Sequence, residues 1–229
     1  MKTVFELALK RILKQRLTIG LMLLFPILLV LIPQPSDLIY PILSYGMFGL
    51  VILFSAFLLS KQILEDRQYK TMIRISASPI SHRDYLIGHL SAYMIVMWIQ
   101  ISLFHLLALI VWDASIQFYV WAYLLMFIYT IMSISFCLFW HSMFKTYATS
   151  IAIFSVVANL MAVIGGMSFP LMYLPDRLRQ IALIIPTYWY AYGLEQITFR
   201  MFDIVMLCLL ILIGFAIIFL TIGSKRRFE

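Results

Sequence analysis

The chain has 229 residues, of which 64% are hydrophobic and 12% are charged, and its mean hydropathy is +1.00. A soluble domain is about one quarter charged, so this composition excludes an ordinary soluble enzyme, and the long apolar runs exclude a disordered chain. In a soluble protein, the net charge of +7 would suggest a nucleic-acid partner. Here the basic residues lie where they would orient a membrane protein, so the charge is explained by the membrane.

Six uncharged runs have about the length that a helix needs to cross the hydrocarbon core, roughly 20 residues. The fifth run is uncharged as far as Pro175, but its helix is expected to end near Gly165 and Gly166. A further run, Gln180–Leu194, contains Pro186 and is too short to span. We therefore predict an all-α polytopic membrane protein with spans at about residues 17–32, 38–60, 90–112, 114–140, 146–166 and 204–224.

The basic residues predict the orientation of these spans, because cytoplasmic loops are enriched in Lys and Arg. With six spans, both termini, the loop of residues 61–89 and Lys145 share one side, which carries 14 of the 17 basic residues. The other side carries Arg177, Arg179 and Arg200. Both termini are therefore expected in the cytoplasm, the protein is expected in the cell membrane, and no nucleic-acid partner is expected.

Residues 1–16 are expected to form an amphipathic helix at the membrane surface. Lys2, Lys10 and Lys14 recur at helical spacing beside an apolar stripe. This pattern suits a helix that lies on an anionic surface. A plain helical extension of the first span explains the same pattern, so both interpretations stay open.

The loop of residues 61–89 is the largest segment expected in the cytoplasm. Ser78-Pro79 disfavours helix at Ser78, and Ser81 with Asp84 is a capping signature ahead of an apolar run. The pattern predicts a helix, a break, and a new helix from Ser81. Exposed apolar side chains among charges indicate a docking surface, and a solvated connector against lipid head groups is the alternative.

Residues 167–201 are expected to lie outside the membrane on the opposite side. Pro175 suits the first position of a short helix, and Thr187 is expected to cap a second one. Two such helices, rich in Tyr and Trp, would line an exit for an amphipathic substrate or act as plain interfacial anchors. The candidate exit residues are Pro186, Tyr188, Trp189, Tyr190 and Tyr192.

The sequence lacks the motifs of a catalytic or metal-binding protein. There is no G-x-x-x-x-G-K-[ST], no G-x-S-x-G and no H-E-x-x-H. No metal site and no disulfide is expected, because the four histidines form no cluster and Cys137 and Cys208 lie inside apolar runs. The polar residues Gln100, His105 and Asn159 are expected to form hydrogen bonds between membrane helices.

The order of these parts, with two matching stretches, identifies a family resemblance. The first stretch has an acidic start, a Thr, a Ser-Pro pair and a Gly, at Glu65, Thr71, Ser78-Pro79 and Gly88. Lys70 and His89 depart from the pattern, which has Gly and Lys there. The second, looser stretch comprises Gly165-Gly166, Ser168-Phe169-Pro170, Leu174-Pro175 and Pro186-Thr187-Tyr188 ahead of Gly193-Leu194. The chain resembles the type-two ABC exporter permeases, the membrane subunits of many bacterial exporters.

The resemblance implies a single permease domain over residues 1–229 and a role for each part outside the bilayer. Residues 69–80 would be the coupling helix, which docks in a groove of a separate ATPase subunit, and residues 1–16 would be the connecting helix beside it. Two permease subunits, identical or related, would pair with two ATPases, and spans one, two and five would face the translocation path. The implied coupling residues are Glu65, Thr71, Met72, Ile73, Arg74, Ile75, Ser78 and Pro79.

The resemblance also implies the transmembrane subunit of an ATP-driven exporter for an amphipathic substrate, such as a drug, a bacteriocin-like peptide or a lipid. Antibiotic resistance, self-immunity and secretion are equally compatible roles. The chain itself would be no enzyme and bind no cofactor, since ATP and Mg would be held by the partner ATPase, and its other neighbours would be membrane lipid. The alternatives are an ATP-independent channel or sensor and an intramembrane enzyme.

Overall fold

The computed structural model describes residues 2–31, 40–69, 82–112, 115–168, 171 and 174–225. Within these residues the regular structure is helical and no strand occurs, which confirms the predicted all-α class. The helices are α1 (Lys2–Lys14), α2 (Arg16–Leu31), α3 (Tyr40–Gln68), α5 (His82–Val111), α6 (Ile116–Met143), α7 (Tyr147–Ile164), α8 (Asp176–Ala182), α9 (Pro186–Thr198) and α10 (Phe202–Lys225).

Five described helices, α3, α5, α6, α7 and α10, are long and apolar enough to cross a membrane. A sixth candidate is the pair α1 and α2, which bend by 76° between Val4–Lys14 and Arg16–Leu31. The bend falls at Gln15, whose backbone N–H donates to the Ile12 carbonyl at 2.9 Å in a tight turn. These helices identify a multi-pass membrane protein.

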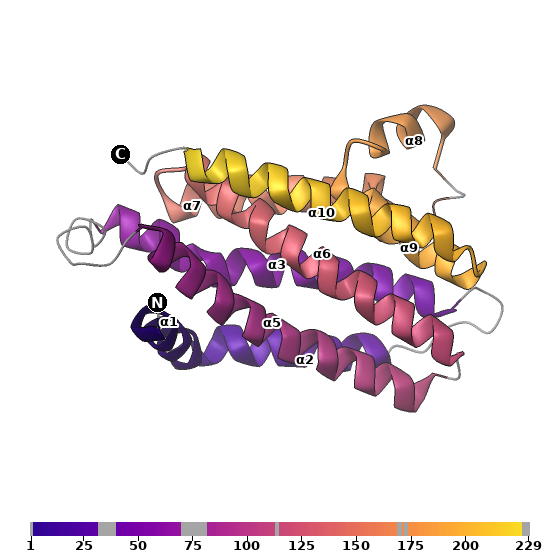
Figure 1. The fold of residues 1–229 in the computed structure, drawn as a ribbon, viewed down its shortest axis with the longest axis horizontal. Helices are drawn as coiled ribbons and strands as arrows, with labels where there is room; N and C mark the ends of the chain where they lie inside the picture. The colour runs from indigo at the N-terminus through magenta and orange to yellow at the C-terminus, as the bar shows by residue number, and fades with distance from the viewer. Residues whose placement is uncertain are drawn as a thin grey trace.

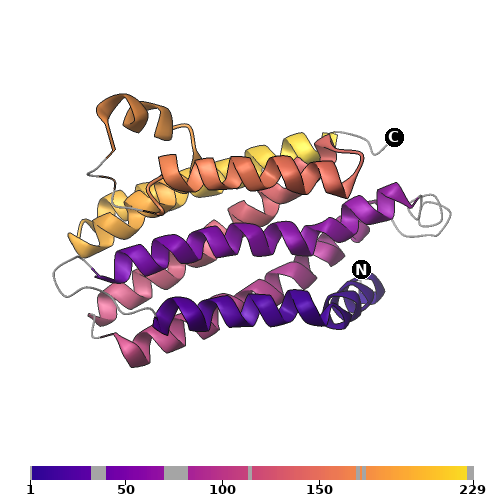
Figure 2. The ribbon, with the colours of Figure 1, turned by 180° about the vertical axis from the view of Figure 1, so that it is seen from behind.

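The long helices lie side by side along the molecule, and both termini lie at the same end (Figure 1). We name this the basal end, formed by α1, the last turns of α3 and the first turns of α5. The opposite, apical end carries α8 and α9 beside the start of α10. Seen from behind, α7 lies beside α3, and α2 lies on the other side of α3 (Figure 2).

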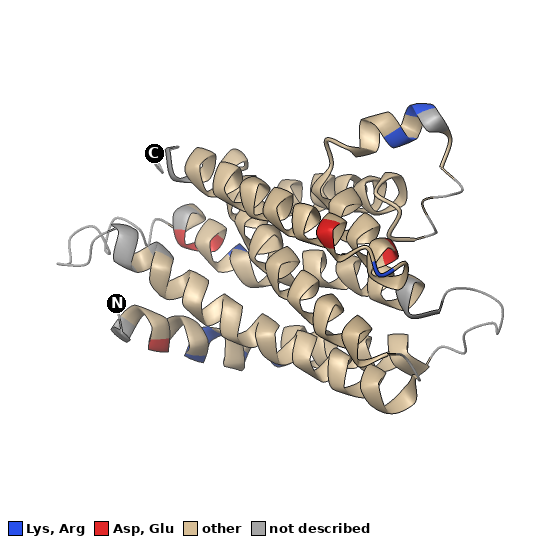
Figure 3. Ribbon diagram, turned by 45° about the vertical axis from the view of Figure 1, so that its right-hand side comes forward, with Lys and Arg blue, Asp and Glu red and all other residues tan. Residues whose placement is uncertain are grey.

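Charged residues gather at these two ends, and the middle of the long helices is free of them (Figure 3). The central helices are α3 and α6, most of whose residues are buried, whereas α7 and α10 leave most of theirs open to the surroundings. Aromatic stacking fills the core: the rings of Phe48 and Phe104 lie 4.0 Å apart, as do those of Phe57 and Phe154. Cys137 and Cys208 are buried and free.

Two helices extend beyond the spans expected from uncharged runs. Helix α3 continues past Ser60 to Gln68, and α5 begins at His82, next to the Ser81 at which a new helix was predicted to begin. The predicted break at Ser78-Pro79 lies outside the described residues. Lys61 and Glu65 pair within α3 at 3.7 Å, so the first charged residues after the uncharged run do not end the helix. The long helices therefore carry their ends out to the basal end.

Candidate functional site

Of the eight predicted coupling residues, Glu65 lies in the described part of the chain. It sits in the last turns of α3, half-buried and paired with Lys61. The other seven lie outside the described residues: Thr71, Met72, Ile73, Arg74, Ile75, Ser78 and Pro79. The described part of this candidate site is therefore the pair of helix ends, of α3 and α5, between which residues 70–81 run.

An ion pair between two helices at the basal end involves Asp66, next to Glu65 in α3. Its carboxylate accepts two hydrogen bonds from the Arg11 guanidinium of α1, at 2.9 and 3.0 Å. It also accepts one from the Tyr85 hydroxyl of α5, at 2.6 Å. This network joins three helices through one buried carboxylate. Sequence reasoning missed it, because Arg11 and Asp66 are 55 residues apart and no local pattern pairs them.

Helix α1 lies against α5 through a buried stripe of Val4, Ala8 and Ile12. Gly88 permits the close approach, since a Cβ there would come within 2.8 Å of the Val4 side chain. The basic residue Lys10 is exposed, so α1 is amphipathic as expected. Because α1 leaves α2 at 76°, it is no straight extension of the first span.

The hydrogen bonds to Asp66 raise the pKa values of both of its partners, Arg11 and Tyr85. Burial lowers the pKa of the Arg11 guanidinium, but its hydrogen bond to Asp66 and the Asp66 charge outweigh this, and the pKa is raised. Burial raises the pKa of the Tyr85 hydroxyl, and the hydrogen bond to Asp66 raises it further. Arg11 therefore stays cationic and Tyr85 stays a donor throughout the physiological range.

At the apical end, α9 carries the five predicted exit residues. Pro186 is the first residue of the helix and is buried, and Ile185 precedes it as the N-cap. The prediction that Thr187 caps this helix is wrong. Its hydroxyl donates instead to the Met161 carbonyl of α7, at 2.6 Å. Proline already suits the first helical position, which leaves the threonine free to tie α9 to α7.

Tyr190 points into the bundle core. It is fully buried, its hydroxyl donates to the Tyr45 carbonyl of α3 at 2.9 Å, and its ring stacks on Tyr129 of α6 at 4.3 Å. Gly49 of α3 makes room for it, because a Cβ there would lie 2.9 Å or less from the Tyr190 ring. Tyr190 therefore fastens α9 to two central helices.

The other aromatic residues of α9 are buried Tyr188 and the half-buried Trp189 and Tyr192. The ring of Tyr188, which is buried, stacks on that of half-buried Tyr192 at 5.5 Å. The Trp189 indole donates to the Leu183 carbonyl at 2.9 Å. Half-buried Glu195 follows on the same side, and burial raises the pKa of its carboxyl while the Arg179 charge opposes this. Of the predicted exit residues, Trp189 and Tyr192 are the ones partly open to the surroundings.

Gln100 joins three spans, as predicted. Its side-chain amide donates to the Ser55 hydroxyl of α3 and to the Met22 carbonyl of α2, both at 3.0 Å. Pro26, four residues after Met22, has no N–H to donate to that carbonyl. Gln100 therefore supplies the hydrogen bond that the proline removes.

His105 also forms the predicted contact between helices, with its Nδ1 2.9 Å from the Tyr45 hydroxyl. Asn159 does not: it is exposed, and its amide donates to the Ser155 carbonyl of its own helix at 2.7 Å. The prediction for Asn159 is wrong within this chain, because α7 turns that face away from the bundle.

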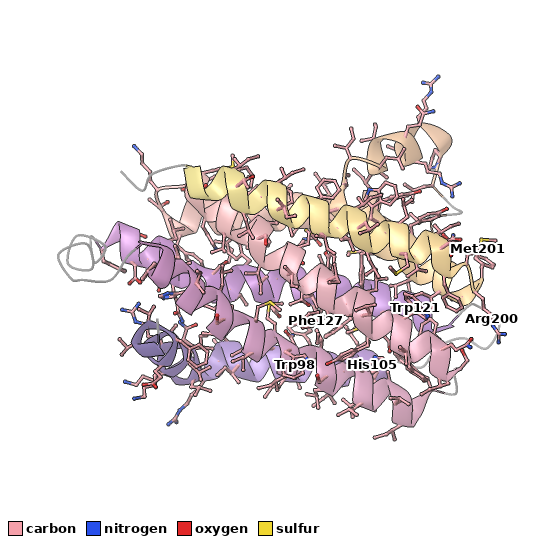
Figure 4. The ribbon with its side chains drawn as sticks, in the orientation of Figure 1. Trp98, His105, Trp121, Phe127, Arg200 and Met201 are labelled. Atoms are coloured by element: carbon pink, nitrogen blue, oxygen red, sulfur yellow. The ribbon has the colours of Figure 1, made fainter. Side chains whose placement is uncertain are left out.

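The half-exposed Trp98 of α5 forms a polar contact that the sequence did not suggest. Its indole donates to the Tyr123 hydroxyl of α6, to which the Ser102 hydroxyl also bonds at 2.9 Å. Figure 4 shows Trp98 and His105 along α5, with His105 nearer the apical end. The polar side chains of Trp98, Gln100 and His105 in α5 thus form contacts with neighbouring helices. The described residues contain no group of three or more His, Cys, Asp or Glu that could hold a metal ion.

The geometry alone does not identify the protein family, and a comparison with family models does. A family model described as ABC-2 family transporter protein matches residues 27–225. The match begins inside α2 and ends with α10, so it covers the five long spans and α9 but not α1. A comparison with curated proteins gives no match.

Proposed function

Because the chain belongs to the ABC-2 transporter family, we propose that it is the transmembrane subunit of an exporter driven by a separate ATPase. Family members of this kind are membrane subunits and have no ATPase activity of their own. The observation that carries the proposal is the match over residues 27–225, which includes every long span from α3 to α10. The absence of a P-loop in the sequence supports a separate source of ATP hydrolysis.

The basal end is proposed to face the cytoplasm of the cell membrane and to receive the ATPase. Support comes from the excess of Lys and Arg on this side and from α3 and α5, whose ends project there. Glu65 and residues 71–79 would contact the ATPase, which would hold ATP and Mg. A second permease, identical or related, would complete the assembly.

The substrate is proposed to be amphipathic: a drug, an antimicrobial peptide or a lipid. The partly open aromatic side chains of Trp189 and Tyr192 at the apical end support this, because such rings bind molecules with both apolar and polar parts. Export would provide antibiotic resistance, self-immunity or secretion. A transport assay in which a polar polymer alone is moved would contradict this substrate class.

The test of the proposed function is a pull-down of tagged protein in mild detergent with ATP present, followed by mass spectrometry. We expect an ATPase subunit with a P-loop in the eluate, and a second, different permease there would indicate a heterodimer. An eluate without any ATPase would favour the alternatives, an ATP-independent channel or sensor or an intramembrane enzyme.

A further inference from the structure

The Arg11–Asp66–Tyr85 network ties α1 to both helices that flank residues 70–81. Within the described residues there are two ion pairs, and this is the one that joins different helices. The Asp66 side chain is 8% exposed and the Arg11 side chain 50% exposed. The carboxylate is therefore the buried partner, and the guanidinium reaches it from the surface.

A carboxylate this deeply buried is unfavourable without donors. Arg11 supplies two of the three hydrogen bonds to Asp66. If α1 moved away from α5, Asp66 would keep the Tyr85 hydrogen bond alone. A movement of α1 would thus be costly unless other donors could reach the same carboxylate.

Two candidate donors lie on the helix faces of this network: Gln62, one turn before Asp66 in α3, and Tyr93, two turns after Tyr85 in α5. The side chains of Gln62, His89 and Tyr93 are all more than nine-tenths buried. Gln62 Nε2 and Oε1, His89 Nε2 and the Tyr93 hydroxyl have no hydrogen-bond partner among the described residues. Buried polar atoms in proteins are nearly always paired, so these unpaired atoms require an explanation. Gln62 Nε2 and the Tyr93 hydroxyl are the two that can donate, since the Nδ1 of His89 already donates to the Tyr85 carbonyl at 3.0 Å and leaves Nε2 as an acceptor.

Their positions suit an exchange of partners. Gln62 lies four residues before Asp66 in α3, so the two side chains are neighbours on one helix face. Tyr85, His89 and Tyr93 follow one another along one face of α5, with the rings of Tyr85 and His89 4.3 Å apart. The ring centroids of His89 and Tyr93 lie 5.9 Å apart, so the three rings form a continuous row that starts at Tyr85, the partner of Asp66.

We propose that Arg11, Asp66 and Tyr85 form a latch that holds α1 on α3 and α5, and that Gln62 and Tyr93 are reserve donors that take over Asp66 when α1 is released. Arg11 and Asp66 are then positioning residues, because they set where α1 lies relative to the ends of α3 and α5. The role of the latch in transport rests on the proposed function, in which ATP binding moves the basal end. The latch itself can be tested without an ATPase.

The first test measures release of α1 by cysteine labelling. Ala8, which is 1% exposed on the buried stripe of α1, is replaced by Cys in a chain with Cys137→Ala and Cys208→Ala. A water-soluble maleimide is added to opened native membranes, and the labelling rate is measured. We expect Arg11→Gln to raise the rate roughly tenfold, as for the loss of hydrogen bonds to a charged group. Arg11→Lys should stay close to the wild-type rate.

The matched control is Lys14→Gln, which removes the same charge from an exposed position of the same helix. It should leave the rate unchanged. Equal labelling of the Arg11→Gln and Lys14→Gln variants would overturn the latch, because α1 would then be held by its apolar stripe alone.

The second test examines the reserve donors. Gln62→Leu should slow labelling several-fold, since the released state loses a donor for Asp66. In an Asp66→Leu background the same change should have no effect, because no carboxylate is left to take over. If Gln62→Leu changed the rate equally with and without Asp66, Gln62 would act independently of Asp66 and the reserve role would be excluded.

A labelling experiment with ATP distinguishes failure of the latch from failure of the proposed function. With its ATPase bound, addition of ATP should raise labelling of the Ala8→Cys protein and should not raise it further in the Arg11→Gln variant. If no ATPase co-purifies but Arg11→Gln still speeds labelling, the latch stands and the proposed function fails. If an ATPase co-purifies and Arg11→Gln has no effect on labelling, the latch fails and the proposed function stands.

Discussion

The two ends of the molecule are fastened by different chemistry. At the basal end, α1 is held by a guanidinium–carboxylate–hydroxyl network and by a narrow apolar stripe. At the apical end, α9 is held by a fully buried tyrosine, stacked rings and a glycine that permits close approach. Close packing of the aromatic side chains resists displacement, whereas the basal network, as proposed above, exchanges one set of hydrogen-bond donors for another. We therefore expect the basal end to move and the apical end to act as a rigid frame.

The largest effect is expected from substitutions at the proposed contact between the basal end and the ATPase. Ile73→Glu and Arg74→Glu should each abolish stimulation of the ATPase and transport, because both residues belong to the docking surface predicted from the sequence. Neither change should reduce the amount of inserted protein. The measurement is ATPase activity in proteoliposomes, and normal coupling in both variants would contradict the assignment of this segment.

A large effect on stability is expected from overpacking the apical frame. Gly49→Ala should destabilise the protein by about 1–3 kcal/mol, because the new methyl group would meet the Tyr190 ring and the Met167 side chain. Gly214→Ala is the matched control, since a Cβ at that membrane position meets nothing within 4 Å. Thermal unfolding in detergent compares the two, and equal melting temperatures would mean that the apical packing is looser than described.

A smaller effect is expected from the hydroxyl that fastens α9 to α3. Tyr190→Phe keeps the ring stacked on Tyr129 but leaves the Tyr45 carbonyl without that donor. The loss should be about 1 kcal/mol. Tyr192→Phe, on the more open side of α9, should change the melting temperature much less. If Tyr192→Phe lowered the melting temperature more than Tyr190→Phe, α9 would be held mainly through its outer face.

The smallest effect concerns Glu195, whose carboxyl pKa is raised mainly by burial. A raised folded-state pKa means that the folded protein binds the proton more tightly, so this group lowers stability as the pH rises past about 4.5. Glu195→Gln should therefore stabilise the protein at pH 7 by less than about 1 kcal/mol, since the group is half-exposed and screened. At pH 4 the gain should vanish. A gain that is the same at both pH values would have another cause.

Much of the helical layout follows from simple features of the sequence. Uncharged runs locate the spans because burial of backbone in lipid requires apolar helices. Helix ends were less predictable, as α3 shows by continuing through Lys61 and Glu65. The 76° bend at Gln15 has no proline or glycine to announce it. The amphipathic pattern of residues 1–16 ahead of an uncharged run favoured a separate surface helix, but it did not give the angle.

The site was less predictable than the fold, for a physical reason. Long-range partners such as Arg11 and Asp66 are chosen by tertiary packing and not by neighbours in sequence. The same is true of Thr187, where a capping pattern was present but the hydroxyl found a carbonyl of α7 instead. Gln100 was predicted correctly as a polar contact between spans because a buried amide in lipid needs a partner, but the sequence could not say that a backbone carbonyl would be one.

The hydrogen bond from Gln100 to Met22 has a consequence for biosynthesis. The donor lies 78 residues after the acceptor, so α2 is made and delivered to the membrane well before Gln100 exists. Until then the Met22 carbonyl, which Pro26 leaves without a backbone donor, would face hydrocarbon unsatisfied. We expect α2 to stay beside the insertion machinery until α5 arrives. Cross-linking of α2 to that machinery should accordingly persist longer in a Gln100→Leu chain, which ties the order of membrane assembly to a single amide.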